Sequence, residues 1–252
     1  MTTFSLEGKI ALVTGASRGI GEAIALCFAE NGAECILASR KAEALEGVVK
    51  KIEAAGGKAI ACAANMGDLT QIADLFAFIK DKYGKLNILV NNAATNPYFG
   101  AMTGAPEWAW DKTLAVNLKG PFFATQQAAK LMDVAGGGAI VNVASVNAVK
   151  PAPTQGIYSI TKAGLIAMTK AYAKELASQN IRVNALLPGL TKTDFSKALF
   201  EMEEIHQYVI QEIPLKRHAE PHEMAGAVLY LVSDAASFTT GICIACDGGY
   251  LA

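Results

Sequence analysis

The sequence predicts a single α/β domain in which helices cover both faces of a doubly wound parallel sheet of about seven strands. Short apolar segments alternate with segments whose apolar residues recur at helical spacing, and the connections between them are short. The short segments are almost continuously apolar, which is typical of strands buried on both faces. Because strands that alternate with helices usually run parallel, this rhythm favours one central sheet.

The predicted elements follow one another with little sequence left over. Strands are expected at residues 9–13, 34–38, 58–63, 88–90, 139–144, 182–186 and 242–245. Helices are expected at residues 20–30, 42–55, 70–82, 107–133, 158–177 and 221–232. We find no linker, internal repeat or low-complexity segment, so residues 1–252 are expected to form one domain.

One segment, residues 190–215, does not fit the alternation. It lies between the sixth strand and the last helix and carries the large side chains Phe195, Phe200, Met202 and Tyr208. Long insertions beside the ligand-binding edge of a sheet are often lids. We therefore expect residues 190–215 to cover a binding site.

The composition narrows the class of protein. The net charge is −1 and no block of basic residues occurs, which argues against nucleic acid or an anionic membrane as the main partner. No apolar run approaches the roughly 20 residues needed to cross a bilayer. The first residues lack a signal-peptide pattern and the last are not a peroxisomal signal, so a cytoplasmic protein is expected.

The cysteine and histidine patterns do not predict a metal site. Two of the five cysteines form a C-x-x-C pattern, but they lie in a predicted strand, where residues three apart point to opposite faces. No second pair completes a zinc site, and a proline separates the two histidines that lie four apart. We expect reduced core cysteines and no metal; the residues concerned are Cys27, Cys35, Cys62, Cys243, Cys246, His218, Pro221 and His222.

The segment Thr14–Gly21 follows the first predicted strand and opens the first helix. Its glycines, Gly15, Gly19 and Gly21, permit backbone angles closed to other residues and let a phosphate approach the main chain. The helix start adds unpaired N–H groups and a positive dipole end. A purely structural turn is the alternative, and the rest of the chain argues against it.

A second constellation lies in the other half of the chain. Ser145 ends a predicted strand, at the edge where open α/β sheets bind ligands. Tyr158 and Lys162 are four residues apart and therefore share one face of a helix. A lysine ammonium beside a phenol favours the phenolate, so we expect a tyrosine pKa below its usual value of about 10. Such a tyrosine can give or take a proton, while Ser145 holds the substrate oxygen.

With these motifs the chain resembles the classical short-chain dehydrogenases/reductases along essentially its whole length. The resemblance implies a Rossmann-like domain that transfers a hydride between a nicotinamide and a carbonyl carbon. Tyr158 would be the proton donor, Ser145 would polarise the carbonyl oxygen and Lys162 would assist Tyr158 and bind the ribose. Asn117 would hold a proton-relay water. The implied cofactor-binding residues are Gly15, Ser17, Arg18, Gly19, Ile20, Gly21, Ser39, Arg40, Asn65, Met66, Asn91, Ala93, Tyr158, Lys162, Pro188, Gly189, Thr191 and Thr193.

The chain departs from the family pattern at two positions. Ala94 replaces a glycine after the fourth strand, and Asn65 stands where an aspartate usually lies near the adenine. Asparagine can still accept a hydrogen bond there. Within the family, the stretch 91–100 and the turn 38–40 resemble the carbonyl reductases related to dehydrogenase/reductase member 4.

The residue after strand two sets the expected cofactor preference. Enzymes that select NADH usually place an acid there, whereas this chain has Ser39, followed by Arg40. Serine can donate a hydrogen bond to a 2′-phosphate, and arginine offers a planar fork that suits it. Arg18 adds a second cation, so NADP(H) is the expected cofactor; the alternative is that both arginines are solvated surface charges.

Three functional readings remain open. The first is an NADPH-dependent carbonyl reductase or alcohol dehydrogenase that acts on a small, apolar or aromatic substrate, as the lid residues suggest. The second is a 3-oxoacyl-[acyl-carrier-protein] reductase, which shares the same motifs. The third is a cofactor-binding regulator without catalysis, which need not keep all four catalytic residues. The resemblance also implies a homotetramer that pairs through the helices at 107–133 and 158–177 and through the C-terminal strand.

Overall fold

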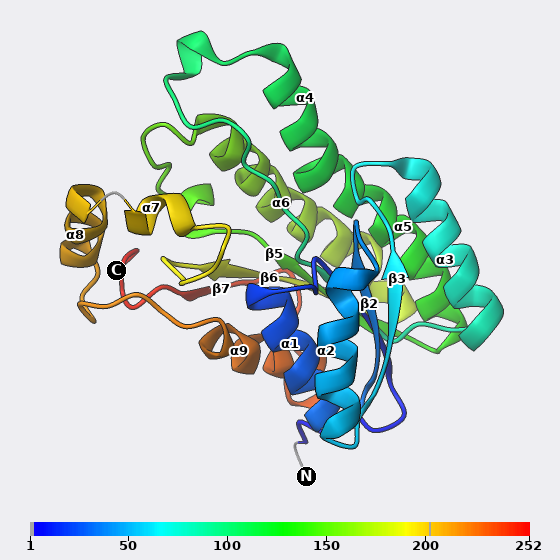
Figure 1. The fold of residues 1–252 in the computed structure, drawn as a ribbon. Helices are drawn as coiled ribbons and strands as arrows, with labels where there is room; N and C mark the ends of the chain where they lie inside the picture. The colour runs from blue at the N-terminus through cyan, green and yellow to red at the C-terminus, as the bar shows by residue number, and fades with distance from the viewer. Residues whose placement is uncertain (1–2, 202) are drawn as a thin grey trace.

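The computed structural model describes residues 3–201 and 203–252. Within them, seven parallel strands form one sheet in the order β3-β2-β1-β4-β5-β6-β7 (Figure 1). The chain runs outward from β1 to β3, then crosses to β4 and continues to β7, which confirms the predicted doubly wound sheet. The strands are β1 (Ile10–Thr14), β2 (Glu34–Ser39), β3 (Lys58–Ala63), β4 (Ile88–Asn91), β5 (Gly138–Val143), β6 (Ile181–Pro188) and β7 (Cys243–Cys246).

The helices lie in two layers, one on each face of the sheet (Figure 1). Helices α1, α2 and α9 bury apolar side chains against one face, and α3, α5 and α6 do so against the other. The helices are α1 (Gly19–Glu30), α2 (Glu43–Ala54), α3 (Leu69–Tyr83), α4 (Glu107–Leu114), α5 (Gly120–Val134), α6 (Gly156–Glu175), α7 (Lys197–Glu201), α8 (Glu203–Glu212) and α9 (His222–Val232).

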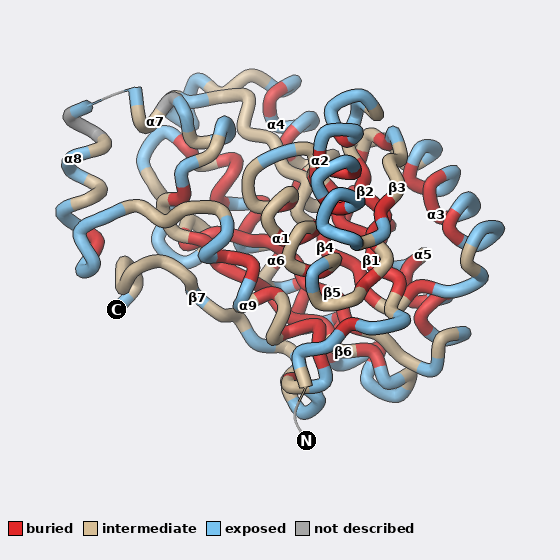
Figure 2. The backbone as a smooth tube through the Cα atoms, turned by 60° about the horizontal axis from the view of Figure 1, so that its bottom comes forward, coloured by how far each residue is buried: buried red, intermediate tan, exposed pale blue. Residues whose placement is uncertain are grey.

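Burial follows the position of each strand in the sheet. The central strands β1 and β4 are buried at every residue, whereas the edge strands β3 and β7 are only half-buried (Figure 2). Each central strand has helices on both faces, which explains its continuously apolar sequence. The predicted strands therefore coincide with the observed ones to within two residues at each end.

Strand register brings the ends of β1, β4 and β5 to one edge. Val13 pairs with Val90, and Val90 pairs with Val141, so the segments that follow these strands emerge side by side. The glycine turn follows β1, and Ser145 follows β5. Two motifs separated by more than a hundred residues are thus placed at the same edge of the sheet.

The long helix predicted at 107–133 is interrupted. A π-helical segment, η2 (Ala115–Lys119), separates α4 from α5 and contains Asn117. The extra backbone residue of a π turn often marks a functional position. Gly120 follows at once, where an added Cβ would overlap the carbonyl oxygen of Met66. The helix therefore passes too close to the Met66 backbone for any other residue at this position.

The insertion at 190–215 contains the two short helices α7 and α8. An isolated parallel bridge between Thr191 and Ala219 joins its start to the segment that follows its end. Phe195, Phe200 and Tyr208 are found in this segment, whereas Met202 lies outside the described residues. In the part of the chain that the structure describes, no helix combines the length and apolarity needed to cross a membrane.

Candidate active site

A cavity of about 1050 Å³ opens at the carboxyl edge of the sheet, between the glycine turn and the insertion that carries α7 and α8. Its size is at the upper end of the range for small-molecule and cofactor sites. The cavity brings together most of the predicted site residues. These are Gly15, Ser17, Arg18, Gly19, Ile20, Ser39, Arg40, Asn65, Met66, Ala93, Ser145, Tyr158, Lys162, Pro188, Gly189, Thr191 and Thr193.

Ser145, Tyr158 and Lys162 line the same cavity from two elements. Ser145 precedes the short 3-10 turn η3 (Val146–Ala148), and its Oγ accepts a hydrogen bond from the Asn147 amide at 3.1 Å. Tyr158 and Lys162 both project from the first turns of α6. The Lys162 Nζ donates to the Val143 carbonyl oxygen at 2.6 Å and lies 5.5 Å from the centre of the Tyr158 ring. The end of β5 thus positions both the serine and the lysine.

The pKa values of Tyr158 and Lys162 differ from the sequence-based expectation. Burial raises the pKa of the Tyr158 phenol to about 12, although hydrogen bonding with Ser145 lowers it in part. Burial also lowers the pKa of the Lys162 ammonium to about 7. The prediction that Lys162 holds the tyrosine pKa below 10 is therefore wrong for the chain alone, because desolvation disfavours both charged forms. At neutral pH the phenol keeps its proton.

Asn117 lies behind these residues and is fully buried. Its side chain accepts a hydrogen bond from the Thr95 amide at 2.8 Å and donates to the Thr95 carbonyl at 2.9 Å. It also donates to the Thr161 hydroxyl, next to Lys162 on α6. The side chain of Asn117 therefore fixes the segment after β4 to α6. It does not line the cavity itself, and its part in a proton relay stays a prediction.

The glycine turn is shaped by close contacts that exclude side chains. Gly15 and Gly19 adopt φ values of +66° and +62°, a conformation that favours glycine. A Cβ on Gly15 would come within 2.9 Å of the Ala93 Cα, and one on Gly21 would overlap the Gly15 carbonyl. Gly21 consequently packs beneath the turn and does not line the cavity.

Asn92 holds this turn, and it was missed as a site residue. Its Nδ2 donates to the carbonyl oxygens of Thr14 at 2.9 Å and Gly15 at 3.1 Å. Its neighbour Asn91 was predicted to contact the cofactor but is buried beneath the cavity, where its Nδ2 donates to Asn142 at 2.9 Å. The sequence could have distinguished Asn91 from Asn92, because successive residues of a strand point to opposite faces.

Polar and cationic residues gather at the opposite end of the cavity from Tyr158. Ser39 ends β2 and the exposed Arg40 follows it, and the Ser39 hydroxyl donates to the Lys41 carbonyl at 3.0 Å. The guanidinium of Arg18 forms an exposed ion pair with Asp194 of the insertion at 3.0 Å. Asn65 accepts a hydrogen bond from the Gly67 amide at 3.0 Å. Its oxygen retains a second lone pair that can face a ligand.

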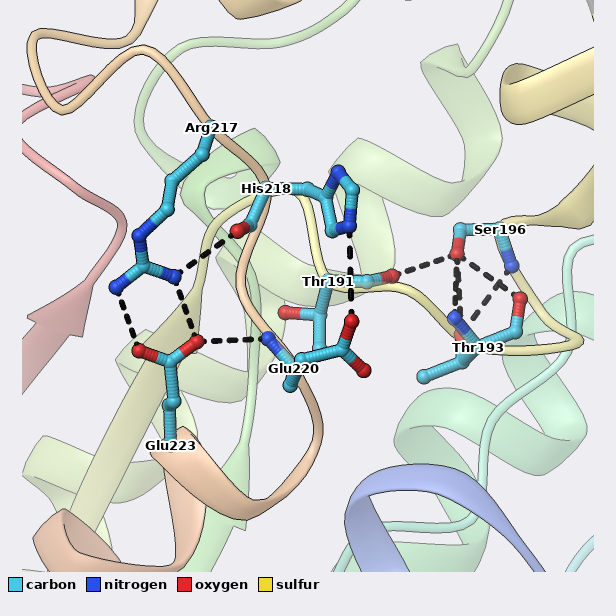
Figure 3. Close-up of polar contacts among 7 residues, drawn as sticks. All are labelled: Thr191, Thr193, Ser196, Arg217, His218, Glu220 and Glu223. Carbon is cyan, nitrogen blue, oxygen red and sulfur yellow. Dashed lines mark hydrogen bonds and ion pairs between the residues drawn. The ribbon is translucent and has the colours of Figure 1, made fainter.

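The base of the insertion is fixed by two polar clusters (Figure 3). In the first, the Ser196 hydroxyl donates to the Thr191 carbonyl at 2.6 Å and contacts the Thr193 hydroxyl. In the second, Arg217 binds Glu223 through both carboxylate oxygens, at 2.7 and 2.8 Å. Thr191 and Thr193, which the family resemblance implies bind the cofactor, are thereby held against the cavity.

The cysteines and histidines take no part in the cavity lining. All five thiols, which lie within the described residues, are free, and Cys35 is buried while the other four are half-buried. Burial raises the pKa of each thiol, so all five stay protonated and poorly nucleophilic at neutral pH. His218 packs against the ring of Phe200. Among residues 3–201 and 203–252, no His, Cys, Asp and Glu side chains cluster in a way that could hold a metal ion.

The residues present fit a nicotinamide dinucleotide. The left-handed glycines and the start of α1 leave room and N–H groups for a diphosphate. Ser39, Arg40 and Asn65 lie where the adenosine half would reach, and Lys162, Thr191 and Thr193 lie at the other end. The sheet edge between β1 and β4, where the strand order reverses, is the usual position for such a ligand.

Comparison with known proteins supports this interpretation. A family model described as "Enoyl-(Acyl carrier protein) reductase" matches residues 15–251. The rabbit (Oryctolagus cuniculus) dehydrogenase/reductase SDR family member 4 is 39% identical over 97% of this chain and 94% of its own length. The Thermotoga maritima 3-oxoacyl-[acyl-carrier-protein] reductase FabG is 41% identical over 97% of this chain and 98% of its own.

Two solved structures share the fold and hold a cofactor. A gluconate 5-dehydrogenase from Burkholderia cenocepacia, in complex with NADP and tartrate, superposes with a TM-score of 0.94 at 29% identity, covering 98% of this chain and 97% of its own. A 7α-hydroxysteroid dehydrogenase, in complex with NADH and 7-oxo glycochenodeoxycholic acid, gives 0.93 at 33% identity, covering 98% and 95%. The chain belongs to the classical short-chain dehydrogenases/reductases, a family of NAD(P)-dependent oxidoreductases.

Proposed function

We propose that this protein uses NADPH to interconvert a carbonyl compound and an alcohol, with Tyr158 as the proton donor and acceptor. The observation that carries the proposal is the position of Tyr158 beside Ser145 and Lys162 in the cavity that begins at the glycine turn. A non-catalytic cofactor-binding protein would not need these three side chains together. The bound dinucleotide would supply or accept the hydride.

The protein's own residues supply position and the proton. Ser145 donates a hydrogen bond to the substrate oxygen and holds it next to the Tyr158 hydroxyl. Because the phenol of Tyr158 is protonated at neutral pH, it is ready to protonate that oxygen as the carbonyl is reduced. Lys162, whose pKa lies near 7, can gain and lose a proton at neutral pH and so helps to restore the proton on Tyr158. Asn117 would fix the backbone around this relay.

The preference for NADPH rests on the charges at the adenosine end of the cavity. Position 39 carries a serine in place of an acid, and Arg40 and Arg18 are both exposed there. A carboxylate at position 39 would repel a 2′-phosphate, whereas these cations attract it. The NADP complex of the B. cenocepacia relative supports this proposal, and the NADH complex of the hydroxysteroid dehydrogenase shows that the fold accepts either cofactor.

The substrate is proposed to be a small molecule with a substantial apolar portion. Phe195, Leu199, Tyr208 and Val209 of the insertion face the cavity, together with Phe99. This supports the proposal that residues 190–215 form a lid over the substrate. The T. maritima relative favours a second candidate, reduction of a 3-oxoacyl group on acyl carrier protein.

We also propose a homotetramer that pairs through α4, α5 and α6. An apolar groove lies on the outer side of these helices, lined by Leu118, Phe122, Phe123, Met168 and Tyr172. Light scattering should give a mass about four times the 26.4 kDa of the chain. A monomer at micromolar concentration contradicts this part of the proposal. The cytoplasmic location remains a prediction from the sequence.

The direct experiment follows the absorbance of NADPH and NADH at 340 nm with the purified protein. The panel contains aliphatic ketones, aryl ketones, diones and a 3-oxoacyl thioester. We expect oxidation of NADPH that depends on a carbonyl substrate and on Tyr158. No turnover with any carbonyl compound, while NADPH still binds, would favour the non-catalytic reading.

A further inference from the structure

A cluster of three side-chain amides lies beside the catalytic serine and has no role in the mechanism above. Asn96 comes from the segment after β4, Asn147 from η3, and Gln155 immediately precedes α6. The Oε1 of Gln155 accepts hydrogen bonds from the Nδ2 of Asn96 at 3.4 Å and the Nδ2 of Asn147 at 3.3 Å. Three separate segments therefore converge on one amide group.

This convergence leaves the other end of the Gln155 amide free. Among the described residues, the Gln155 Nε2 has no hydrogen-bond partner, and it is not one of the fully enclosed polar atoms. Gln155 and Asn147 both line the cavity that contains Ser145 and Tyr158, whereas Asn96 lies behind them. Because the Oε1 is engaged by two amide donors and Gln155 lines the cavity, Nε2 is the part of this amide that is left to bind a ligand.

The backbone around Gln155 is held in an unusual conformation. Thr154 has a φ of +64°, which is rare for a residue with a branched side chain. Its carbonyl oxygen accepts a hydrogen bond from the Gly100 amide at 3.0 Å, and prolines stand at positions 151 and 153. Residues kept in such conformations concentrate at ligand-binding sites, where the surrounding structure maintains them. The side chain of Gln155 is thus presented from a constrained loop.

Asn147 links Gln155 to the catalytic serine. Asn147 contacts both groups: its backbone amide donates to the Ser145 Oγ at 3.1 Å, and its side chain donates to Gln155. Gln155 also lies three residues before Tyr158, in the turn that starts α6. A substrate whose carbonyl oxygen lies against Ser145 and Tyr158 therefore brings its adjacent atoms near the Gln155 Nε2.

We infer that Gln155 is a specificity-determining residue that donates a hydrogen bond to a second oxygen of the substrate. The preferred substrates are carbonyl compounds with another oxygen acceptor one or two carbon atoms from the reacting carbonyl, such as 1,2-diones and 3-oxo esters. Phe99, Phe195 and Leu199 then hold the apolar remainder. This inference rests on the proposed carbonyl reduction and narrows its substrate class.

The reason for discrimination is the cost of an unpaired donor. Gln155 is only 9% exposed, so a substrate without a second oxygen removes the remaining water from the Nε2 and offers nothing in return. Sites that are built to hydrogen-bond a substrate group reject analogues that lack it more strongly than apolar pockets reject an altered methylene.

The test compares 1-phenyl-1,2-propanedione with 1-phenyl-1-propanone in the wild-type protein and in Gln155→Met. The two ketones share one skeleton, and methionine has nearly the length of glutamine but no amide. The intrinsic difference in reactivity between the dione and the monoketone is the same for both proteins. It therefore cancels when the dione's advantage over the monoketone is compared between the wild type and Gln155→Met. We expect that advantage, as a ratio of kcat/KM, to fall by about 10-fold or more in Gln155→Met, because the dione loses a hydrogen bond and the monoketone no longer leaves a donor unpaired.

Gln155→Glu gives a second and more conservative test. Its carboxylate can still accept the hydrogen bonds of Asn96 and Asn147, but it presents an oxygen where the donor was. The dione advantage should fall at least as far as in Gln155→Met, because two acceptors then face one another. An unchanged ratio in both variants, or an equal loss for both ketones, would overturn the inference. Wild-type reduction of the monoketone that disappears in Tyr158→Phe would still uphold the proposed function.

Discussion

The ring of Phe195 lies 5.6 Å from the ring of Tyr158, centre to centre, with 43° between their planes. Phe195 belongs to the insertion at 190–215, and Tyr158 belongs to α6, so this contact joins the proposed lid to the catalytic residue. The Phe195 side chain is 43% exposed when the chain is alone. Its remaining surface is available to cover a substrate bound against Tyr158.

Phe195→Ala should weaken substrate capture because it removes this apolar cover. We expect kcat/KM to fall on the order of 10-fold, mainly through KM, since the aromatic surface is lost from the bound complex. Steady-state kinetics with an apolar ketone provides the measurement. Phe78→Ala is a matched control, because Phe78 is 42% exposed and lies on α3, away from the cavity. An equal effect from both substitutions would show that Phe195 has no special role in substrate binding.

The preference for NADPH should shift toward NADH when the charges at positions 39 and 40 are changed. Ser39→Asp with Arg40→Leu removes one attraction for a 2′-phosphate and adds a repulsion at the end of β2. The ratio of kcat/KM for NADPH to that for NADH should exceed one in the wild type and fall by about 100-fold or more in the double variant. The assignment fails if the wild type favours NADH or if the ratio does not move.

The lowered pKa of Lys162 predicts how the free energy of unfolding depends on pH. Its ordinary pKa is 10.5, and burial lowers it to about 7 in the folded chain. Between these values the unfolded state binds more protons, so this group makes the free energy of unfolding rise with pH. Relative to Lys162→Met, the wild type should therefore become progressively more stable between pH 7 and pH 9.5.

Urea unfolding of both proteins without added cofactor measures this difference. The range stops at pH 9.5 because Tyr158 acts in the opposite direction above about pH 10. Lys170→Met, on the exposed side of the same helix, should show no such trend. A difference between wild type and Lys162→Met that is independent of pH would mean that Lys162 is charged in the folded chain at neutral pH.

Gly120 should be one of the least replaceable residues outside the site. An added Cβ overlaps the Met66 carbonyl, and backbone atoms on both sides prevent easy relief. Gly120→Ala should lower the free energy of unfolding by about 1–3 kcal/mol. Gly47→Ala is the matched control, because Gly47 lies inside α2 with open space around its Cα. That substitution should stabilise the protein by roughly 0.5–1 kcal/mol, and equal destabilisation by both would show that the Met66 contact does not decide the effect at position 120.

The sequence predicted the sheet well because its strands are buried on both faces. A run such as residues 88–90 must be apolar whatever its neighbours are, so its pattern is local. The interruption at Asn117 was missed, although Gly120 and Pro121, which commonly break a helix, follow it directly. The close approach of Gly120 to Met66 could not be predicted, because these residues are far apart in the chain.

The sequence motifs predicted which residues line the site, but not all of its chemical properties. Tyr158 and Lys162 share a helix, so their proximity follows from spacing alone. The pKa of Tyr158 did not follow, because it depends on how deeply the fold buries the ring and on where the Lys162 Nζ is held. Gln155 was missed for a similar reason: its amide acquires a direction only through Asn96 and Asn147, which the fold brings to it.

The central claim is that Tyr158 transfers the proton, and Tyr158→Phe tests it most directly. The substitution keeps the ring and its contact with Phe195 and removes only the hydroxyl. With a carbonyl substrate that the wild type reduces, kcat should fall by more than about 100-fold, while NADPH binding, measured by its fluorescence, stays unchanged. Turnover close to that of the wild type in a variant that binds NADPH normally would contradict the account.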